Sequence, residues 1–257
     1  MSRPVALVTG ASAGIGVEFA RELAARGYDL VLVARRRDRL DALAAELSAA
    51  HAGLNVHVVA ADLAAADAAP RLASDLAGDG IAVDLLVNNA GFGAHGAFLA
   101  SDPANAANMI ALNVATPVAL ARAFVPGMVE RRRGGIINVA STAAFQPLPG
   151  MAVYGATKAF VLSFSEALHE EVRRSGVTVT ALCPGATETE FFGIAGERAA
   201  IGRKRSVHDV VRTGLRAFEG KRAVAIDGPA NAMLAESVRF MPRSIVARLS
   251  AVVMGAH

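Results

Sequence analysis

Short apolar runs, many of them β-branched, alternate along the chain with longer stretches in which Ala, Leu, Arg and Glu recur at helical spacing. The short runs predict strands over Val5–Val8, Asp29–Val33, Asn55–Ala60, Leu85–Asn88, Gly135–Ala140, Val177–Cys183 and Ala223–Asp227. The longer stretches predict helices over residues 14–26, 37–50, 67–78, 103–133, 153–175 and 206–219. Strands with few polar positions that alternate with helices are typical of a parallel sheet covered on both faces. We therefore expect an α/β fold with a doubly wound, mostly parallel seven-stranded sheet flanked by helices.

The length of the chain fits one α/β domain. Its 257 residues are too few for two ordinary enzyme domains, and 53% hydrophobic residues provide ample material for one core. We expect this domain over residues 1–228, with residues 229–257 as a basic, amphipathic helical extension of it. In the extension Ile245, Leu249, Val252 and Val253 recur at helical spacing, with Arg243, Ser244 and Arg248 beside them. Such an apolar stripe would pack on the domain, enter a dimer interface or lie on a membrane surface, and we favour packing or dimerisation.

Cysteine usage and the N-terminus bear on the compartment. The single cysteine, Cys183, excludes an intramolecular disulfide and any site built from several cysteines, and it suits a reducing compartment. The first residues lead straight into the first predicted strand, without the apolar stretch of a signal peptide. No uninterrupted apolar run reaches the roughly 18–20 residues that span a bilayer. We expect a cytoplasmic protein.

The charge is unevenly distributed. The net charge is only +3, but residues 196–257 hold 11 of the 26 Lys and Arg residues and 5 of the 23 Asp and Glu residues. Nucleic-acid binding would normally require a stronger basic field, interleaved aromatic residues or a known module. The chain has no Trp and two Tyr, and it lacks zinc-finger and RNP spacing. We therefore expect no nucleic-acid partner.

A glycine-rich turn follows the first predicted strand. The segment Thr9–Gly16 has glycines at 10, 14 and 16 and opens the first predicted helix. Glycines let a backbone approach a pyrophosphate closely, and the N-terminus of a helix attracts its negative charge. The spacing Gly-x3-Gly-x-Gly differs from the G-x-G-x-x-G fingerprint, and such a turn alone can be ordinary turn chemistry. Its place between strand and helix favours a dinucleotide site.

The end of the second predicted strand indicates which dinucleotide binds. Sites for NAD usually hold an Asp or Glu here for the ribose 2′-hydroxyl, whereas an Arg accommodates a 2′-phosphate. This chain has Ala34 followed by Arg35, Arg36 and Arg37. The alternative is a solvated helix start, but cations at a helix N-terminus oppose the helix dipole, so a bound anion explains them better. The sequence therefore predicts NADPH.

Polar residues follow the later strands in a set that suits proton transfer. Asp62 follows the third strand, Asn88–Gly91 the fourth, and Ser141 the fifth. Tyr154 and Lys158 are four residues apart, so a helix would place both side chains on one face. Asn113 interrupts an apolar helical stretch, although Asn is a weak helix former.

These motifs, in this order, resemble the short-chain dehydrogenase/reductase family in its single-domain, NADP-type form of about 250 residues. The resemblance is carried by Thr9–Gly16, Asn88–Gly91, Asn113, Ser141, Tyr154-x3-Lys158 and Pro184-Gly185-x3-Thr189. It implies a Rossmann fold and hydride transfer between the nicotinamide of NADPH or NADP+ and a carbonyl or alcohol substrate. It also implies a homodimer or homotetramer.

The predicted catalytic residues are Asn113, Ser141, Tyr154 and Lys158. Carbonyl reduction needs a proton donor near the oxygen, and Tyr154 offers its phenol. A free phenol has a pKa of about 10, and we expect Lys158 to lower that pKa by stabilising the phenolate. Ser141 would hydrogen-bond the substrate oxygen. The resemblance adds that Lys158 also holds the nicotinamide ribose and that Asn113 holds a water of a proton relay.

The resemblance extends the cofactor site to other positions. The full set is Gly10, Ser12, Ala13, Gly14, Ile15, Gly16, Arg35, Arg36, Asp62, Leu63, Asn89, Ala90, Gly91, Tyr154, Lys158, Pro184, Gly185, Thr187 and Thr189. Among these, Asp62 would bond the adenine, and Pro184–Thr189 would hold the nicotinamide carboxamide. The six histidines show no metal-ligand spacing, so we expect no metal.

Two segments should face the substrate, Phe145–Val153 and a lid over Glu190–Arg205. They contain Phe145, Leu148, Met151, Phe191, Phe192 and Ile194, which favours an apolar or acyl-like substrate unless these side chains only pack the lid itself. Two other functions stay open on this fold. One is an NADP-sensing regulator without turnover, which the complete set of catalytic residues disfavours. The other is a peripheral membrane or interaction protein that uses the basic tail.

Overall fold

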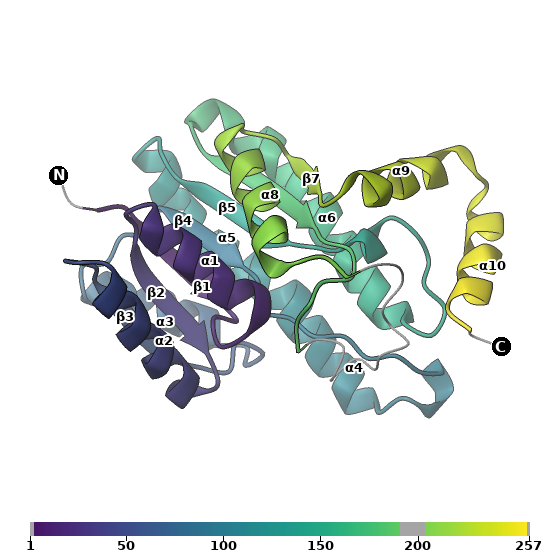
Figure 1. Ribbon diagram of the computed structural model, residues 1–257, viewed down its shortest axis with the longest axis horizontal. Coiled ribbons are helices and arrows are strands. Elements are labelled where there is room, and N and C mark those ends of the chain that lie inside the picture. Colours follow the sequence, from purple (N-terminus) through teal and green to yellow (C-terminus); the bar gives the residue numbers. More distant parts are fainter. Residues whose placement is uncertain (1–2, 191–203, 256–257) are drawn as a thin grey trace.

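The computed structural model describes residues 3–190 and 204–255. In this part of the chain a seven-stranded, wholly parallel sheet runs in the order β3-β2-β1-β4-β5-β6-β7 (Figure 1). The strands are β1 (Val5–Thr9), β2 (Asp29–Ala34), β3 (Val56–Ala60), β4 (Leu85–Asn88), β5 (Gly135–Val139), β6 (Thr178–Cys183) and β7 (Val224–Ile226). The predicted fold class and all seven predicted strands are confirmed.

Helices cover both faces of the sheet. One face carries α1 (Gly14–Ala25), α2 (Arg37–Ala50) and α8 (Val207–Glu219), and the other carries α3 (Ala68–Gly78), α5 (Thr116–Glu130) and α6 (Ala152–Val172). Each helix packs on the sheet through an apolar side. In α2, for example, the buried residues Leu40, Leu43 and Leu47 recur at helical spacing and face the sheet. The result is one apolar core on each side of the sheet.

The strand order places a switch point between β1 and β4. From β1 the chain builds outward to β2 and β3, and then returns to add β4 on the other side of β1. Helices on the two sides therefore diverge, and a crevice opens at the carboxyl ends of these strands. This is the edge at which the sequence places its polar motifs.

The long predicted helix over 103–133 is not one regular helix. It consists of α4 (Pro103–Ile110), a π-helical turn, η2 (Ala111–Ala115), and α5, which ends at Glu130. Pro117 lacks the N–H that would bond to the carbonyl of Asn113 in a regular α-helix, so the helix widens at this point. Arg132 then turns the chain with a positive φ of 54°, which ends the helical stretch before β5.

The same stretch, Pro103–Glu130, is long and apolar enough to cross a membrane by length and composition alone. Asn105, Asn108 and Asn113 interrupt it before Arg122, which is why the sequence shows no continuous apolar run. Core helices of soluble proteins pass the same test. Leu120 and Met128 of α5 are fully buried in the core on one face of the sheet, so we assign this stretch to the covering layer.

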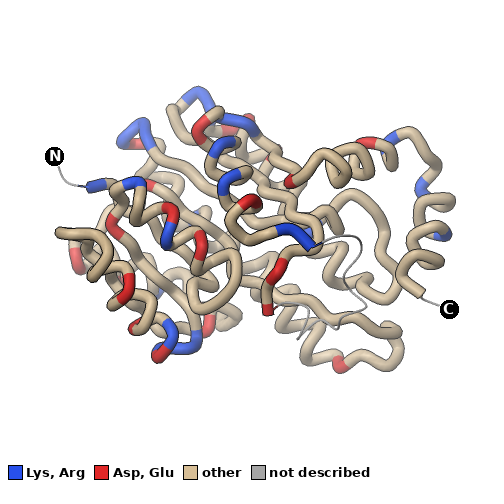
Figure 2. The backbone as a smooth tube through the Cα atoms, viewed as in Figure 1, with Lys and Arg blue, Asp and Glu red and all other residues tan. Residues whose placement is uncertain are grey.

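Residues 229–255 form a C-terminal arm. It comprises α9 (Pro229–Ser237), a short turn, η6 (Val238–Phe240), and α10 (Arg243–Val253), and it extends beyond the edge of the sheet (Figure 1). Figure 2 shows basic residues along it. The predicted stripe Ile245, Leu249, Val252 and Val253 is exposed by 45–68%, so the rest of the described chain covers it only in part. That a second copy of the chain or a membrane surface covers the stripe stays a prediction.

Short 3-10 turns complete the described elements. They are η1 (Phe98–Ala100), η3 (Thr142–Ala144) and η4 (Arg173–Ser175). Of these, η3 follows β5 directly, and the Ser141 side chain caps it by accepting a hydrogen bond from the N–H of Ala143 at 3.1 Å. The cap fixes the backbone of Ser141 at the end of β5.

A buried polar ladder joins β4, β5 and α6 beneath the crevice. The Asn88 amide donates to the Asn138 side-chain oxygen at 2.8 Å, and the Asn138 amide donates to the Ser165 hydroxyl at 2.8 Å. Ser165 in turn donates to the carbonyl of Val161 at 2.6 Å. Asn138 and Ser165 are fully buried, so water cannot reach their polar groups. The hydrogen bonds of the ladder therefore replace the bonds that these groups make to water in the unfolded chain.

We expect Asn138→Ala to lower the free energy of unfolding by about 1–3 kcal/mol, because it leaves the buried Asn88 amide without an acceptor. Denaturant titration of the purified protein measures this. The matched control is Asn108→Ala, the same change at an exposed position of α4, and it should have little effect. Equal free energies for the two variants would contradict this account of the ladder.

Candidate active site

A cavity of about 410 Å³ lies at the carboxyl ends of the strands. It brings together nearly all of the predicted site residues. Those that line it are Gly10, Ser12, Ala13, Gly14, Ile15, Arg35, Arg36, Asp62, Leu63, Asn89, Ala90, Gly91, Ser141, Tyr154, Lys158, Pro184, Gly185, Thr187 and Thr189. Two predicted residues, Gly16 and Asn113, are buried and do not line the cavity.

The glycine-rich turn has a backbone that side chains would not tolerate. Gly10 and Gly14 adopt positive φ angles of 68° and 53°. A Cβ on Gly16 would collide with the carbonyl oxygen of Gly10, so the turn lies directly on the first turn of α1. Ala13, the N-cap of α1, offers no side-chain cap, so the first N–H groups of the helix have no such partner. This arrangement fits a pyrophosphate held on backbone N–H groups.

A hydrogen-bond network ties the turn after β1 to the turn after β4. The Thr9 hydroxyl accepts bonds from the N–H groups of Asn89 at 2.9 Å and Ala90 at 3.0 Å, and it donates to the carbonyl of Val87 at 3.2 Å. The Asn89 amide donates back to the carbonyl of Thr9 at 2.9 Å. The two turns therefore form one rigid floor for the cavity.

Arginines surround the end of the cavity at β2. Arg36 donates to the Ser12 hydroxyl at 3.2 Å, and Arg36 and Arg39 both pair with Glu190, at 3.2 and 2.7 Å. Their hydrogen bonds, led by that of Arg39, hold the pKa of the Glu190 carboxyl below its usual value. Arg35 lines the cavity and is exposed. The pairing with Glu190, which joins α2 to the loop after β6, has no signal in the sequence because its partners lie over 150 positions apart.

Tyr154 lies in the first turn of α6, buried beside Ser141. Burial raises the pKa of the Tyr154 phenol to about 12, against the lowering effect of its side-chain hydrogen bond with Ser141. The sequence-based expectation of a lowered pKa is therefore wrong for this cavity, because the loss of hydration outweighs nearby polar groups. At neutral pH the phenol keeps its proton and can act as a donor.

Lys158, one turn further along α6, is also buried. Its Nζ donates to the carbonyl of Val139 at 2.8 Å and lies 5.8 Å from the centre of the Tyr154 ring. Burial lowers the pKa of Lys158 to about 8. The ammonium form is therefore the main form at neutral pH, but only by a margin of about one pH unit.

Asn113 acts on the cavity through the loop after β4. Its side-chain oxygen accepts from the N–H of Phe92 at 3.1 Å, and its amide donates to the carbonyl of Phe92 at 2.9 Å and to Thr157 at 3.1 Å. A Cβ on Gly91 would lie 2.9 Å from the Asn113 oxygen, so this loop packs tightly on the π-helical turn. The side chain thus holds the cavity wall, and the predicted water relay stays a prediction.

The remaining cofactor positions lie on the other walls. Asp62 accepts from the N–H of Ala64 at 3.1 Å, and the carbonyl of Leu63 accepts from the Thr116 hydroxyl at 2.5 Å. Across the cavity, Thr187 donates to the carbonyl of Gly185 at 3.1 Å, and the Thr189 side chain abuts Gly14. The loop after β6 therefore closes over the glycine-rich turn.

The substrate side of the cavity is apolar. Of the predicted residues, Leu148 and Met151 line it, whereas Phe145 packs on a separate apolar cluster with Cys183. Phe191, Phe192 and Ile194 lie outside the described residues, as does most of the predicted lid. Gln146, which also lines the cavity, lies in the predicted segment Phe145–Val153, whereas the lining residues Leu112 and Met254 were not predicted from the sequence.

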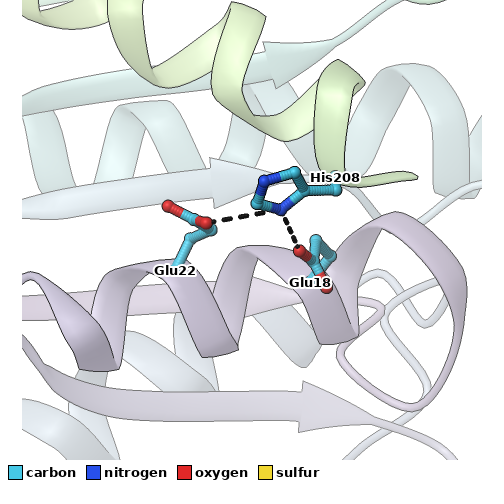
Figure 3. Close-up of side chains that lie close together, drawn as sticks. All are labelled: Glu18, Glu22 and His208. Carbon is cyan, nitrogen blue, oxygen red and sulfur yellow. Dashed lines mark hydrogen bonds and ion pairs between the residues drawn. The ribbon is translucent and has the colours of Figure 1, made fainter. Parts of the chain in front are cut away.

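One group of potential metal ligands occurs in the described part of the chain, away from the cavity. Glu18 and Glu22 of α1 face His208 of α8 (Figure 3). His208 Nδ1 lies 2.8 Å from Glu18 and 3.5 Å from Glu22, and Glu22 also pairs with Arg26 at 3.5 Å. Each carboxylate thus has a basic partner within the chain, so the group is an ion-pair contact between two helices.

Comparison with known proteins agrees with this geometry. The family model described as short chain dehydrogenase matches residues 4–199. The chain is 37% identical over 193 residues to the very-long-chain 3-oxoacyl-CoA reductase of Bos taurus, covering 74% of this chain and 61% of that protein. The NADP-dependent 3-hydroxy acid dehydrogenase YdfG of Salmonella typhi is 39% identical over 197 residues, covering 74% and 75%. This chain thus spans about three fifths of the bovine relative.

A solved structure matches over more of the chain. The short-chain dehydrogenase from Sphingobium yanoikuyae in complex with NADPH is 38% identical, with a TM-score of 0.84, covering 92% of each chain. Sequence and fold therefore agree with the family that the motifs resemble. The chain belongs to the short-chain dehydrogenase family.

Proposed function

We propose that this protein is an NADPH-dependent oxidoreductase that transfers a hydride between the nicotinamide and a carbonyl or alcohol carbon of a small molecule. One observation carries the proposal: Ser141, Tyr154 and Lys158 open into the same cavity as the glycine-rich turn. A regulator that only senses NADP would need no buried proton donor beside its cofactor site. The family match and the names of the relatives support the enzyme.

NADPH bound on the glycine-rich turn would supply the hydride. Tyr154 gives its hydroxyl proton to the substrate oxygen as negative charge develops there, and Ser141 holds that oxygen by a hydrogen bond. The Lys158 ammonium stabilises the phenolate that remains. In the oxidation direction the phenolate takes the proton back from the alcohol.

The 2′-phosphate of the cofactor is assigned to the arginines at the end of β2. Arg35 and Arg36 both line the cavity there, and Ala34 leaves no carboxylate to oppose a phosphate. Glu190 pairs with both Arg36 and Arg39, so a phosphate that binds Arg36 competes with this carboxylate. The Salmonella relative is named as NADP-dependent and the Sphingobium structure contains NADPH, which supports the same choice.

The substrate is assigned to 3-oxoacyl or 3-hydroxyacyl compounds. Both curated relatives have names that place the reacting oxygen on carbon 3 of an acyl chain. An acyl chain needs an apolar wall beside a polar reaction centre, and Leu148 and Met151 provide such a wall next to Tyr154. The apolar or acyl-like substrate expected from the sequence fits this cavity.

NADPH should bind more tightly than NADH. A charge-assisted hydrogen bond contributes roughly 1.5–3 kcal/mol, so Arg35→Ala should weaken NADPH binding by about ten- to a hundredfold and leave NADH nearly unchanged. Fluorescence titration gives both dissociation constants. Arg37→Ala is the matched control, because Arg37 pairs with Asp41 and does not line the cavity. Equal affinities of the wild type for the two cofactors would refute the assignment.

Tyr154→Phe should abolish carbonyl reduction and leave NADPH binding nearly intact, because it removes only the hydroxyl that donates the proton. Loss of general acid catalysis corresponds to a rate decrease of roughly 10²–10⁴-fold. Stopped-flow measurement of NADPH oxidation with a 3-oxoacyl thioester, beside an NADPH titration of the same variant, tests both parts. Retention of most of the wild-type rate would remove Tyr154 from the mechanism.

The reduction rate should fall above pH 8. Burial lowers the pKa of Lys158 to about 8, so the ammonium that stabilises the phenolate is present below this pH and disappears above it. With saturating NADPH, kcat/KM should decrease by roughly tenfold per pH unit on the alkaline side. The guanidinium in Lys158→Arg stays charged over this pH range, so the residual kcat/KM of that variant should not decrease above pH 8. A flat wild-type profile to pH 10 would contradict the role of Lys158.

A further inference from the structure

The far end of the chain contributes to the active-site cavity. Met254, directly after α10, is only 4% exposed and lines the cavity. In the sequence it lies far from the other lining residues, all of which occur at or before Glu190. It belongs to a buried apolar cluster with Met109, Leu148, Met151 and Tyr154. The residue therefore packs around the proposed proton donor.

The end of α10 fixes the position of Met254. Its N–H donates to the carbonyl of Ser250 at 2.9 Å, and Gly255 then ends the helix with a positive φ of 62°. Val246 and Met254 are the buried residues of this segment, eight positions apart and so on nearly one face of the helix. The adjacent face, with Leu249 at 52% exposure, is only partly covered in the described chain.

The base of the C-terminal arm is held at the cofactor side of the same cavity. The Asn231 amide of α9 donates to the carbonyl of Asp227 at 2.6 Å. A Cβ on Gly185 would collide with the Asn231 side chain, so α9 packs directly on the loop after β6. The arm is thus anchored beside Gly185 at one end and by Met254 at the other, and α10 lies at the end of the arm (Figure 1).

Met254 supplies no polar chemistry to the site. Its thioether is apolar and flexible, and it adapts to the shape of a neighbouring group. Ser141, Tyr154 and Lys158 provide the polar centre, so Leu148, Met151 and Met254 form the part of the wall that suits the hydrocarbon portion of a substrate. Because only Val246 and Met254 are buried among residues 243–254, the part of the wall that Met254 provides is attached less firmly than the sheet.

We propose that Met254 is a specificity-determining residue, which closes the apolar end of the cavity and limits the length of the substrate's hydrocarbon chain. The proposal deepens the proposed function and rests on it for the class of substrate. It assigns chain-length selection to the C-terminal arm, whereas the strand ends provide cofactor binding and proton transfer.

The test compares kcat/KM for a short substrate, an acetoacetyl thioester, with kcat/KM for a long one, a 3-oxododecanoyl thioester. Met254→Ala should raise the long-to-short ratio by about tenfold, and Met254→Trp should lower it by about as much, because each changes the apolar room by more than one methylene. Met233→Ala is the matched control, a methionine on the same arm that is 74% exposed and outside the cavity. A ratio in Met254→Ala and Met254→Trp within about twofold of the wild type overturns the proposal.

Binding measurements separate this proposal from the proposed function. NADPH titration should give the same dissociation constant for Met254→Ala and the wild type, which shows that the cofactor site is intact. If the wild type oxidises NADPH with neither thioester, the assignment of a 3-oxoacyl substrate in the proposed function fails. Calorimetric titration of the NADP+ complex with butanol and with dodecanol then tests Met254. Tighter binding of dodecanol relative to butanol in Met254→Ala than in the wild type supports the proposal. The same ratio of the two dissociation constants in both proteins overturns it.

Discussion

The cavity depends on the close approach of two turns, one after β1 and one after β4. The Thr9 hydroxyl bonds to the N–H groups of Asn89 and Ala90, and glycines at positions 10 and 16 leave the space that this approach needs. A side chain at either glycine would push the turns apart. The start of α1 and the loop after β4 would then lose their common orientation, and with it the pyrophosphate cradle.

Burial determines the protonation states of the two titratable residues at the reaction centre. A dry environment favours the neutral form of each group, so it raises the pKa of Tyr154 to about 12 and lowers that of Lys158 to about 8. The two shifts act together in the reduction direction, because the phenol keeps its proton while the lysine is still largely charged at neutral pH. The same burial leaves little phenolate at neutral pH, so oxidation, which needs the phenolate as the base, depends more strongly on the ammonium.

The sequence predicted those parts of the fold and site that local patterns encode. All seven strands follow from apolar runs, and the four-residue spacing of Tyr154 and Lys158 on one helix follows from the helical period. One error has a local cause that the sequence contains, because the π-helical turn around Asn113 arises from Pro117. The other error has no local cause, because tertiary burial reverses the expected pKa shift of Tyr154. Periodicity gives no measure of how dry a cavity will be.

Other features could not be predicted because they join distant parts of the chain. Glu190 meets Arg36 and Arg39 only after the strands have been ordered, and Met254 reaches Tyr154 only through the path of the C-terminal arm. The apolar stripe of α10 shows the same limit. Its period correctly predicts a helix, but the helix packs through Val246 and Met254, which lie off that stripe, and leaves Leu249 in solvent.

These features divide the site into two parts with different constraints. The residues proposed for cofactor binding and proton transfer lie at strand ends and on α6, whose positions are fixed by the sheet and by buried hydrogen bonds such as that of Lys158 to the carbonyl of Val139. The apolar wall proposed to contact the substrate comes from the arm and from loops, which depend on fewer buried residues. A change in the arm alters the room around a substrate without disturbing the sheet. The fold therefore permits substrate range to vary while the chemistry at Tyr154 stays the same.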